Sequence, residues 1–411
     1  FPPRASGGRP GMMELLPCVH EAWREKRGAI EASGRQVIAA LASLAEPDAE
    51  GASRAALFDS AYAYFERAAD LEHGGFGTAP KFPSIANLTY LMRYWARDPE
   101  AHGAARVMVL KQLHAMCAGG IHDHLGGGFH RYSTDREWLV PHFEKMLYDQ
   151  AQIAWACLEA FQVSGRPEYA DAARGIFEYV ARDLTSPGGA FYSAEDADSE
   201  GEEGRFYVWT PAQIEDVLGR DAALFGHRYG VTPHGNFEHG TTILSEVVPL
   251  EACAKRFDLA PAEARRRLDA ARAKLLAARA KRERPHRDDK VLAAWNGLMI
   301  SAYARGARVL GERALAGRAE RAAEFLWKEL RDPASGAMLR RWRDGEAKGA
   351  GQLDDYAYVA LGYFDLYQAT FDPRWLEESA QRDEPPLAKR PGLCPRRHAA
   401  APWKRRAGAR V

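Results

Sequence analysis

A glycine-rich loop that recurs after every second helical segment is the feature that most constrains this chain. The loops contain paired glycines, and a phenylalanine follows each pair within two residues. The pairs begin 53 and 61 residues apart, and each interval holds two segments with helical apolar periodicity. A period of two helices with loops on one edge is typical of stacked helical hairpins, in an open solenoid or a closed toroid. We expect the toroid, because long, chemically rich loops on one edge favour a central pocket. The loops are Gly74–Gly75 with Phe76, Gly127–Gly128 with Phe129 and Gly188–Gly189 with Phe191, with a weaker copy at Ser335–Gly336.

Apolar periodicity predicts most of the chain to be helical, with one strand-rich insertion. Aromatic runs at 190–194 and 205–209 flank an acidic, glycine-containing tip, which predicts a β-hairpin between helices. Residues 226–250 are expected to be irregular. The predicted helices cover residues 13–30, 50–71, 85–96, 101–118, 141–163, 167–184, 211–218, 261–282, 290–310, 313–330 and 354–370.

The segment 119–149 is the richest in chemistry. With His114 just upstream it holds five of the thirteen histidines, and its first half contains too much glycine for a helix or strand. Pro141 stands at a plausible first helical position. At about 100° per residue, His142, Lys145 and Asp149 would share an arc of roughly 60° at one end of a buried helix. We therefore expect a pocket floor here; the alternative is a structural loop whose histidines satisfy backbone groups.

Charge and cysteine content limit the partners and the compartment. Acidic and basic residues balance at 56 each, but residues 381–411 carry nine Lys/Arg and two Asp/Glu, so the rest has a net charge of 0 − 7 = −7. A mildly acidic body argues against nucleic acid as a partner. No apolar run approaches the roughly 20 residues of a membrane span. The five cysteines form no CxxC pair, and such isolated cysteines fit a reducing, cytoplasmic location.

Several long motifs resemble those of the spermatogenesis-associated protein 20 family. They are APKFP, GGIHDHLGGGFHRYSTDREWLVPHFEKMLYDQAQ, FYSAEDADSEGEEGRFYVWT, KVLAAWNGLMISA and DDYA. The resemblance covers residues 1 to about 379 and implies a thioredoxin-like domain followed by an (α/α)6 toroid of the six-hairpin glycosidase type. It thus implies an all-α fold, incomplete at the C-terminus, with the β-hairpin insertion and a remnant of the thioredoxin-like domain.

The same resemblance suggests a division of the chain. Residues 1–33 would be the end of the thioredoxin-like domain and a linker, and residues 34–380 the toroid. The chain would then be a fragment that lacks most of the first domain and the last one or two toroid helices. Residues 381–411 have many prolines and basic residues and no apolar period, so we expect a disordered tail, genuine or read out of frame.

Proteins with this toroid include glycoside hydrolases and sugar epimerases, so the resemblance implies a carbohydrate-related role. Histidines suit proton transfer near neutral pH, and glycosidases need two carboxyl groups. We expect epimerase or isomerase chemistry ahead of hydrolysis; the alternative is a non-catalytic ligand-binding or thiol-redox partner protein whose active motif lies outside this chain. The candidate acid–base residues are His124, His130, His142, Asp149 and Asp196, and the candidate ligand-binding residues are Lys81, Phe129, Arg131, Tyr132, Trp138, Tyr192, Trp295, Asn296 and Asp355.

Some of these candidates have simpler interpretations. Lys81, between prolines on an exposed mounting, could be an ordinary surface lysine. Asn296 could bind an adjacent loop backbone, and Asp355 could cap the helix that it precedes. The run 195–204 resembles half of a calcium-binding loop, but Tyr207 stands at the twelfth position instead of glutamate. We expect no metal or cofactor, and a small-molecule or sugar ligand as the partner.

Overall fold

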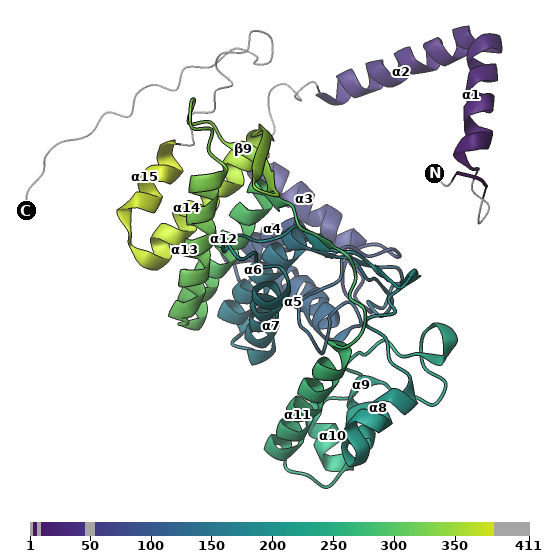
Figure 1. Ribbon diagram of the computed structural model, residues 1–411, viewed down its shortest axis with the longest axis vertical. Helices are drawn as coiled ribbons and strands as arrows, with labels where there is room; N and C mark the ends of the chain where they lie inside the picture. Colours follow the sequence, from purple (N-terminus) through teal and green to yellow (C-terminus); the bar gives the residue numbers. More distant parts are fainter. Residues whose placement is uncertain (1–2, 6–9, 46–53, 382–411) are drawn as a thin grey trace, which may run out of the picture. The chain divides into compact units, whose positions relative to one another are not determined.

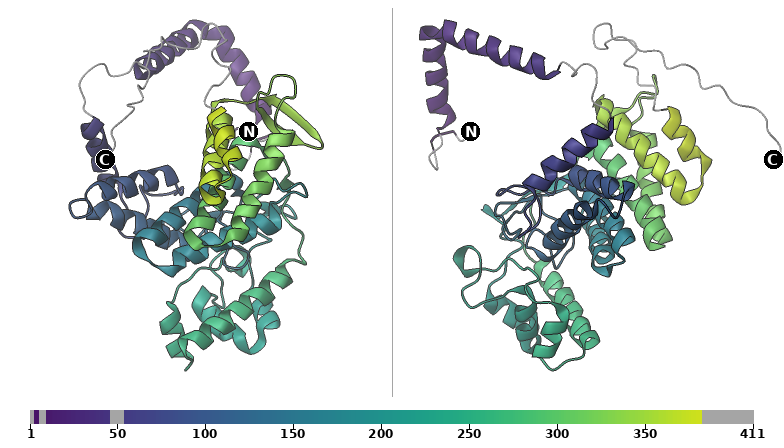
Figure 2. Two further views of the ribbon diagram at one scale, coloured as in Figure 1. Left: turned by 90° about the vertical axis from the view of Figure 1, so that its left-hand side faces the viewer. Right: turned by 180° about the vertical axis from the view of Figure 1, so that it is seen from behind.

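The computed structural model describes residues 3–5, 10–45 and 54–381, and the chain divides into two compact units, residues 1–61 and 62–411 (Figures 1 and 2). The predicted disordered tail, residues 381–411, lies outside the described residues except for Gln381, which is helical. No helix in the described ranges combines the length and the apolar character that crossing a membrane requires.

The first unit contains two long helices where the sequence predicted one. They are α1 (Met12–Glu25) and α2 (Arg27–Ala45), and α3 (Arg54–Ala68) begins in this unit. The backbone leaves helical geometry at Lys26 (φ −123°, ψ 22°), two residues before Gly28, a residue type that weakens helices. The assignment of residues 1–33 to a thioredoxin-like remnant stays a prediction.

Helical hairpins build most of the second unit, and the predicted all-α class is confirmed. Short turns join the helices of each pair: Gly165 and Gly311 end the first helices of two pairs in the left-handed conformation, and Pro167 starts the helix after Gly165. The pairs are α4 (Ile85–Arg97) with α5 (Gly103–Ala118), α6 (Leu147–Ser164) with α7 (Pro167–Asp183), α12 (Ala293–Leu310) with α13 (Arg313–Glu329), and α14 (Leu353–Thr370) with α15 (Pro373–Gln381).

The first helices of these pairs pack in a row. α6 contacts both α4 and α12, and α12 contacts α14 (Figure 1). Buried alanines and glycines let the helices approach closely: an added Cβ at Gly297 of α12 would lie 2.5 Å from the backbone of Tyr358 in α14. The first helices of the four pairs therefore form one continuous row in the second unit.

The glycine loops have the same construction at every repeat, as predicted. Each follows α3, α5, α7 or α13 and is closed by one antiparallel bridge. In the last three loops, the second bridge residue also contacts the fourth residue of the next helix in the row: Gln150 binds Phe129, Asn296 binds Phe191, and Tyr356 Oη accepts a hydrogen bond from Met338 N. The repeat is therefore a structural unit. The bridges are Ala69–Phe76, His122–Phe129, Thr185–Phe191 and Arg331–Met338.

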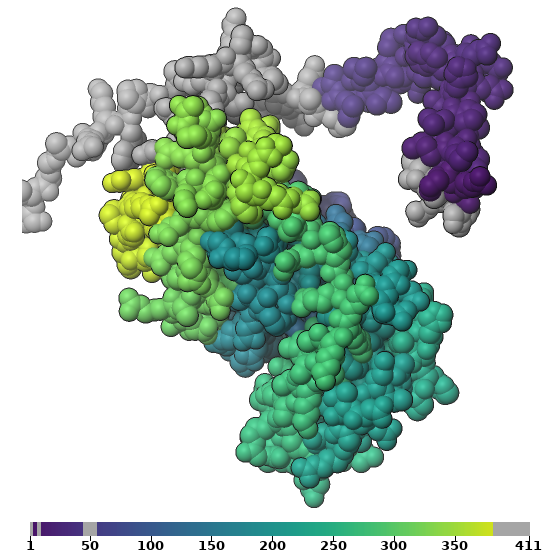
Figure 3. Space-filling view, in the orientation of Figure 1, coloured from purple at the N-terminus to yellow at the C-terminus, as the bar shows by residue number. Residues whose placement is uncertain are grey.

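A smaller helical lobe interrupts the repeat between α7 and α12 (Figures 1 and 3). Its own core includes Trp209, Phe225, Tyr229 and Leu275, and its side chains, teal to green, fill the lower part of the space-filling view. The expectation that residues 226–250 are irregular is partly wrong, because α9 extends into this range and α10 begins at its end. The helices are α8 (Pro211–Leu218), α9 (Ala222–Tyr229), α10 (Leu250–Arg256) and α11 (Pro261–Arg279), with 3-10 turns at Gly219–Asp221 and Glu238–Gly240.

The strands are short and join distant loops. The predicted β-hairpin exists only at its acidic tip, where β5 pairs with β6 around Glu200 and Gly201. The aromatic runs on either side do not pair with each other, because Phe191 bridges Thr185 and Trp209 bridges Thr242. A longer hairpin, β9–β10, was not predicted. The strands are β1 (Tyr132–Ser133), β2 (Pro141–His142), β3 (Lys145–Met146), β4 (Ala194–Glu195), β5 (Asp198–Ser199), β6 (Glu202–Glu203), β7 (Arg287–Asp288), β8 (Val291–Leu292), β9 (Leu339–Arg343) and β10 (Glu346–Ala350).

Candidate functional site

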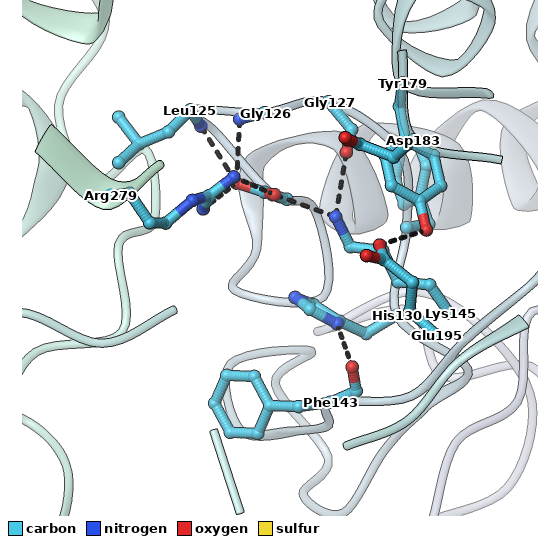
Figure 4. Close-up of polar contacts among 12 residues, drawn as sticks. Leu125, Gly126, Gly127, His130, Phe143, Lys145, Tyr179, Asp183, Glu195 and Arg279 are labelled. Carbon is cyan, nitrogen blue, oxygen red and sulfur yellow. Dashed lines mark hydrogen bonds and ion pairs between the residues drawn. The ribbon is translucent and has the colours of Figure 1, made fainter. Parts of the chain in front are cut away.

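A buried cluster of charged side chains ties the central glycine loop to the rest of the second unit (Figure 4). Asp123 accepts hydrogen bonds from both terminal nitrogens of Arg279, at 2.8 and 2.7 Å, and from Lys145 Nζ at 2.8 Å. These three side chains are at most 4% exposed. Burial alone would raise the pKa of Asp123, but Arg279 and Lys145 hold it well below its usual value. The cluster is closed to solvent, so we assign it a structural role.

Several neighbouring groups compensate the positive charge of Lys145. Its Nζ lies 4.3 Å from the centre of the Tyr179 ring and 5.0 Å from that of Tyr207. The β3–β4 register places Lys145 opposite Glu195, whose carboxylate accepts a hydrogen bond from Tyr179 Oη at 2.7 Å. Burial lowers the pKa of Lys145, and the carboxylate of Asp123 opposes that shift. Lys145 therefore connects the glycine loop with β4 and Tyr207.

The histidines of the loop contact its backbone. His124 Nε2 lies 2.9 Å from Gly119 O, and His130 Nδ1 lies 2.9 Å from Phe143 O (Figure 4). Burial lowers the pKa of His124 to about 4 and that of His130 well below its usual value. Both rings are therefore neutral at pH 7 and poorly suited to proton transfer there. These contacts match the structural alternative for the loop rather than the expected acid–base role.

The predicted helix from Pro141 is wrong at its start, and the shared helical face of His142 and Asp149 is wrong with it. Pro141–His142 is β2, paired with β1, and α6 begins only at Leu147. Pairing of β3 with β4, almost fifty residues later in the chain, holds Lys145 and Met146 extended and overrides the local helical preference. His142 Nδ1 instead lies 2.7 Å from Oε1 of Glu203, which is in β6.

Asp149, in the first turn of α6, lines an open pocket of about 360 Å³. Its Oδ2 atom is sealed from solvent and has no hydrogen-bond partner among the described residues. Burial raises the pKa of Asp149 to about 7, although Arg131 in the same pocket lowers it in part. We call this cavity the Asp149 pocket. It is lined by Phe82, Pro83, Ser84, Ile85, Ala86, Arg131, Tyr148, Asp149 and Gln152.

The Asp149 pocket brings several predicted site residues together. Arg131 Nη1 donates to Glu144 Oε2 at 2.7 Å, just outside the lining. Tyr132 stacks on the lining residue Phe82, with ring centres 4.8 Å apart. Trp295 meets the lining residue Tyr148 edge-on at 4.8 Å, across the contact between α12 and α6. A carboxyl group, a guanidinium group and aromatic faces therefore surround one cavity at the starts of α4 and α6.

Three other predicted ligand-binding residues are occupied by the fold. Lys81 is 1% exposed, and its Nζ donates to Asp70 Oδ2 and Gly74 O, both at 2.7 Å. The expected exposed mounting of Lys81 is therefore wrong, since the loop folds back over it. Trp138 is buried, and its Nε1 also donates to Gly74 O, at 3.1 Å. Phe129 is fully buried in the core.

The remaining candidates also lie outside the Asp149 pocket. Asn296 is fully buried and binds the backbone of Phe191, its simpler interpretation. Asp355 accepts from Gln352 N at 2.9 Å and from Ala294 N at 3.1 Å, so it caps α14. Tyr192 lies under the guanidinium of Arg287 at 4.4 Å. The backbone nitrogen of Asp196 donates to His286 O, beside β4.

A second, larger pocket of about 700 Å³ opens beside the acidic hairpin β5–β6. Sequence reasoning missed it because its walls come from five separate stretches of the chain. The acidic run around Glu200 was the one sequence signal of this pocket. No sequence pattern near Arg282 or Phe237 indicates that they line the same pocket. We call it the Glu203 pocket. Its lining is Thr134, Val140, Pro141, Phe143, Ser199, Glu200, Glu202, Glu203, Arg205, Phe206, Val208, Thr210, Gln213, Phe237, Glu238, His239, Thr241, Arg282 and Glu283.

Solved structures with a similar course of helices include enzymes that act on sugars. Unsaturated glucuronyl hydrolase from Bacillus sp. GL1 aligns with a TM-score of 0.45 at 14% identity, over 79% of this chain and 66% of that one. Cellobiose 2-epimerase from Bacillus thermoamylovorans aligns at 0.34 and 13% identity, over 79% and 84%. At these scores the likeness carries no inference about activity. No family model matches the chain.

Sequence comparison gives much closer relatives. Human spermatogenesis-associated protein 20 is 40% identical over 92% of this chain and 53% of its own length. The rat protein is 36% identical over the same shares, and an uncharacterized protein of Caenorhabditis elegans is 32% identical over 93% and 56%. The chain spans about half the length of the curated relatives it matches. The resemblance seen in the motifs is thereby confirmed: over 92% of its length this chain is similar to the spermatogenesis-associated protein 20 proteins.

Proposed function

We propose that this chain carries out acid–base chemistry on a sugar in the Asp149 pocket. The observation that carries the proposal is the state of Asp149: its buried Oδ2 has no hydrogen-bond partner among the described residues, and the residue lines an open cavity of about 360 Å³ that also contains Arg131. Pockets of this size accept small molecules. A carboxyl group with a pKa near 7 can both give and accept a proton at neutral pH.

Epimerase or isomerase chemistry fits this cavity better than hydrolysis. An aldose–ketose isomerase moves one proton from C2 to C1 beside a carbonyl group, and a single carboxyl group could act as base and then as acid. An epimerase also needs an acid on the opposite face of C2, so isomerisation suits a pocket with one carboxyl group better. Glycoside hydrolysis needs two carboxyl groups on opposite sides of the bond. Among the described residues of the lining, Asp149 is the one carboxylate. Glu144 stands nearby, but its carboxylate is paired with Arg131.

The other surfaces of the pocket suit a polyhydroxylated ligand. Tyr148 and Phe82 present aromatic faces, on which the apolar face of a sugar ring can stack. Arg131 lies on the wall, and its charge would polarise a carbonyl oxygen during proton removal from the adjacent carbon. Gln152, one turn beyond Tyr148 on α6, adds an amide to the lining. These residues would bind and orient the substrate while Asp149 moves the proton.

The alternative proposal is a non-catalytic ligand-binding protein, or a thiol-redox partner protein whose active motif lies outside this chain. Hydrogen bonding to Cys157 and burial both raise the pKa of Cys117 well above its usual value. A thiol with a raised pKa is a poor nucleophile near neutral pH. The cytoplasmic location, and the lack of nucleic acid and membrane partners, stay predictions.

One experiment separates the candidate functions. The purified chain is incubated in D₂O with a panel of aldoses, ketoses and disaccharides, and ¹H NMR follows the sugar signals. An epimerase or isomerase removes the C2–H signal and yields a second sugar, whereas a hydrolase yields monosaccharides without exchange. Saturation transfer to a sugar with no product identifies a binding protein. The proposal fails if no sugar reacts, or if Asp149→Asn reacts as fast as the unaltered chain.

A further inference from the structure

We propose that the Glu203 pocket is a second ligand site, which binds a small organic cation carrying an ammonium or guanidinium group. The pocket encloses about 700 Å³ and shares no lining residue with the Asp149 pocket. Its volume lies within the range of small-molecule sites. The inference does not depend on any activity at Asp149.

The floor of the pocket is aromatic. Phe143 and Phe206 are buried, and the Phe206 ring already lies 5.1 and 5.5 Å from the guanidinium groups of Arg279 and Arg284. The half-buried ring of Phe237 is therefore the aromatic surface that a ligand could contact. Phe237 meets Phe143 edge-on, with ring centres 5.9 Å apart. Val140 and Val208 fill the space around these rings. The negative faces of aromatic rings attract cations, and they also bury the apolar part of an organic cation.

The rim is acidic. Five glutamates and two arginines line the pocket, so its formal charge is −5 + 2 = −3 with His239 neutral. Arg205 is paired with Glu200 at 2.6 Å and with Glu202 at 3.2 Å. Those three side chains therefore compensate one another in large part.

The second arginine is occupied by the protein itself. Arg282 Nη1 donates to Phe206 O and Val208 O, both at 2.8 Å, and its guanidinium lies 3.8 Å from the centre of the Trp209 ring. Burial lowers the pKa of Arg282 to about 10, which leaves it charged at neutral pH. Its Nη1 is therefore bound to the backbone and is not free to bind an anionic ligand.

Two carboxylates are left without a basic partner. Neither Glu238 nor Glu283 forms an ion pair with a described lysine or arginine, and both side chains are exposed. Glu203 adds a third carboxylate, which contacts His142 Nδ1 at 2.7 Å. Within the described residues, no group of three or more His, Cys, Asp or Glu side chains is arranged to hold a metal ion. Unpaired carboxylates in the same pocket as Phe237 therefore point to an organic cation.

The test uses pairs of compounds that differ in charge and little in size. Glucosamine is compared with glucose, and butylguanidinium with butylurea, by isothermal titration calorimetry at low and moderate salt. We expect the cation of at least one pair to bind about tenfold or more tightly than its neutral partner, with a preference that shrinks as salt rises. The pair that responds distinguishes an amino sugar from an open-chain guanidinium compound. Equal affinity within both pairs, or no binding of either cation, overturns the proposal.

Variants locate the site. Glu238→Gln combined with Glu283→Gln keeps the shape of two exposed side chains, and we expect it to reduce the preference for the cation about tenfold. Phe237→Leu should weaken both members of the responding pair, because it removes an aromatic face. Glu251→Gln changes an exposed glutamate of α10 outside the lining and serves as the matched control. A preference that survives the double variant, or falls equally in the control, contradicts the assignment to this pocket. Asp149→Asn should leave the preference unchanged.

Discussion

The side-chain amide of Gln150 holds both backbone polar groups of Phe129. Gln150 Oε1 accepts from Phe129 N at 2.8 Å, and Nε2 donates to Phe129 O at 2.7 Å. Gln150 is the fourth residue of α6 and Asp149 the third, so neighbouring residues serve different purposes. One fixes the glycine loop to the start of the helix, and the other lines the pocket.

This relationship predicts a large stability loss in Gln150→Ala. The variant leaves a buried N–H and a buried C=O of Phe129 without partners, and each orphaned group costs about 1–3 kcal/mol. We expect the free energy of unfolding in urea to fall by about 2–4 kcal/mol. Gln162→Ala, at an exposed position of the same helix, should change it by less than about 0.5 kcal/mol. Similar losses in both variants would mean that the two hydrogen bonds between Gln150 and Phe129 contribute little to stability.

Breaking the buried ion cluster should destabilise the protein further. Asp123→Asn removes the carboxylate that pairs with Lys145 and Arg279 and leaves two buried cations uncompensated. Such a change costs about 3–5 kcal/mol. Urea unfolding of the variant measures the loss, and Asp269→Asn on the exposed face of α11 is the control. An unfolding midpoint close to that of the unaltered chain would contradict the structural role of the cluster.

The buried histidines predict a loss of stability in mild acid. The pKa of His124 is lowered to about 4 in the folded protein, against about 6.5 when the chain is unfolded. Between these values the unfolded chain binds more protons, so stability falls as pH falls from about 6.5 to 4. This residue alone accounts for about 3 kcal/mol at most. His124→Asn should flatten the pH dependence of the urea midpoint in that window, and an unchanged slope would refute the shift.

The raised pKa of Asp149 predicts that the stability of the protein falls as pH rises. Its folded pKa is raised to about 7, so the folded protein holds a proton that the unfolded chain has already released. Its contribution is complete below about pH 4 and is lost as pH rises to 7. Asp149→Asn should therefore gain about 1–3 kcal/mol relative to the unaltered chain at pH 8, and nothing at pH 4. Thermal melts at both values measure this, and a loss of stability at pH 8 would show that the ionised carboxylate is stabilising.

His142 should matter less for catalysis than Asp149. It bridges Glu203 and Glu144 on the partly exposed β1–β2 ribbon, and it is absent from the lining of both pockets. We expect His142→Asn to lower kcat in the sugar assay by less than about tenfold, against about a hundredfold or more for Asp149→Asn. Comparable losses of kcat in the two variants would mean that His142 takes part in catalysis.

Local patterns predicted the helices and the loops because both depend on short-range chemistry. The periodicity of 167–184 and 313–330 and the glycines before Phe129 and Phe191 indicate helical hairpins directly. The site was harder, because long-range contacts decide it. Only the pairing of β3 with β4 shows that His142 is not on α6, and only the folded loop shows that Asp70 buries Lys81. The partnership of Asp123 with Arg279 spans 156 residues, and no local signal announces it.

Deuterium exchange at C2 of a sugar, followed by NMR against pH, tests the proposed role of Asp149 most directly. The proposed chemistry predicts exchange whose rate rises through a transition near pH 7, as Asp149 loses its proton and becomes a base. Asp149→Asn should abolish both the exchange and the transition while the protein stays folded. Exchange that persists in this variant with the same pH profile, or no exchange with any sugar of the panel, would contradict the account.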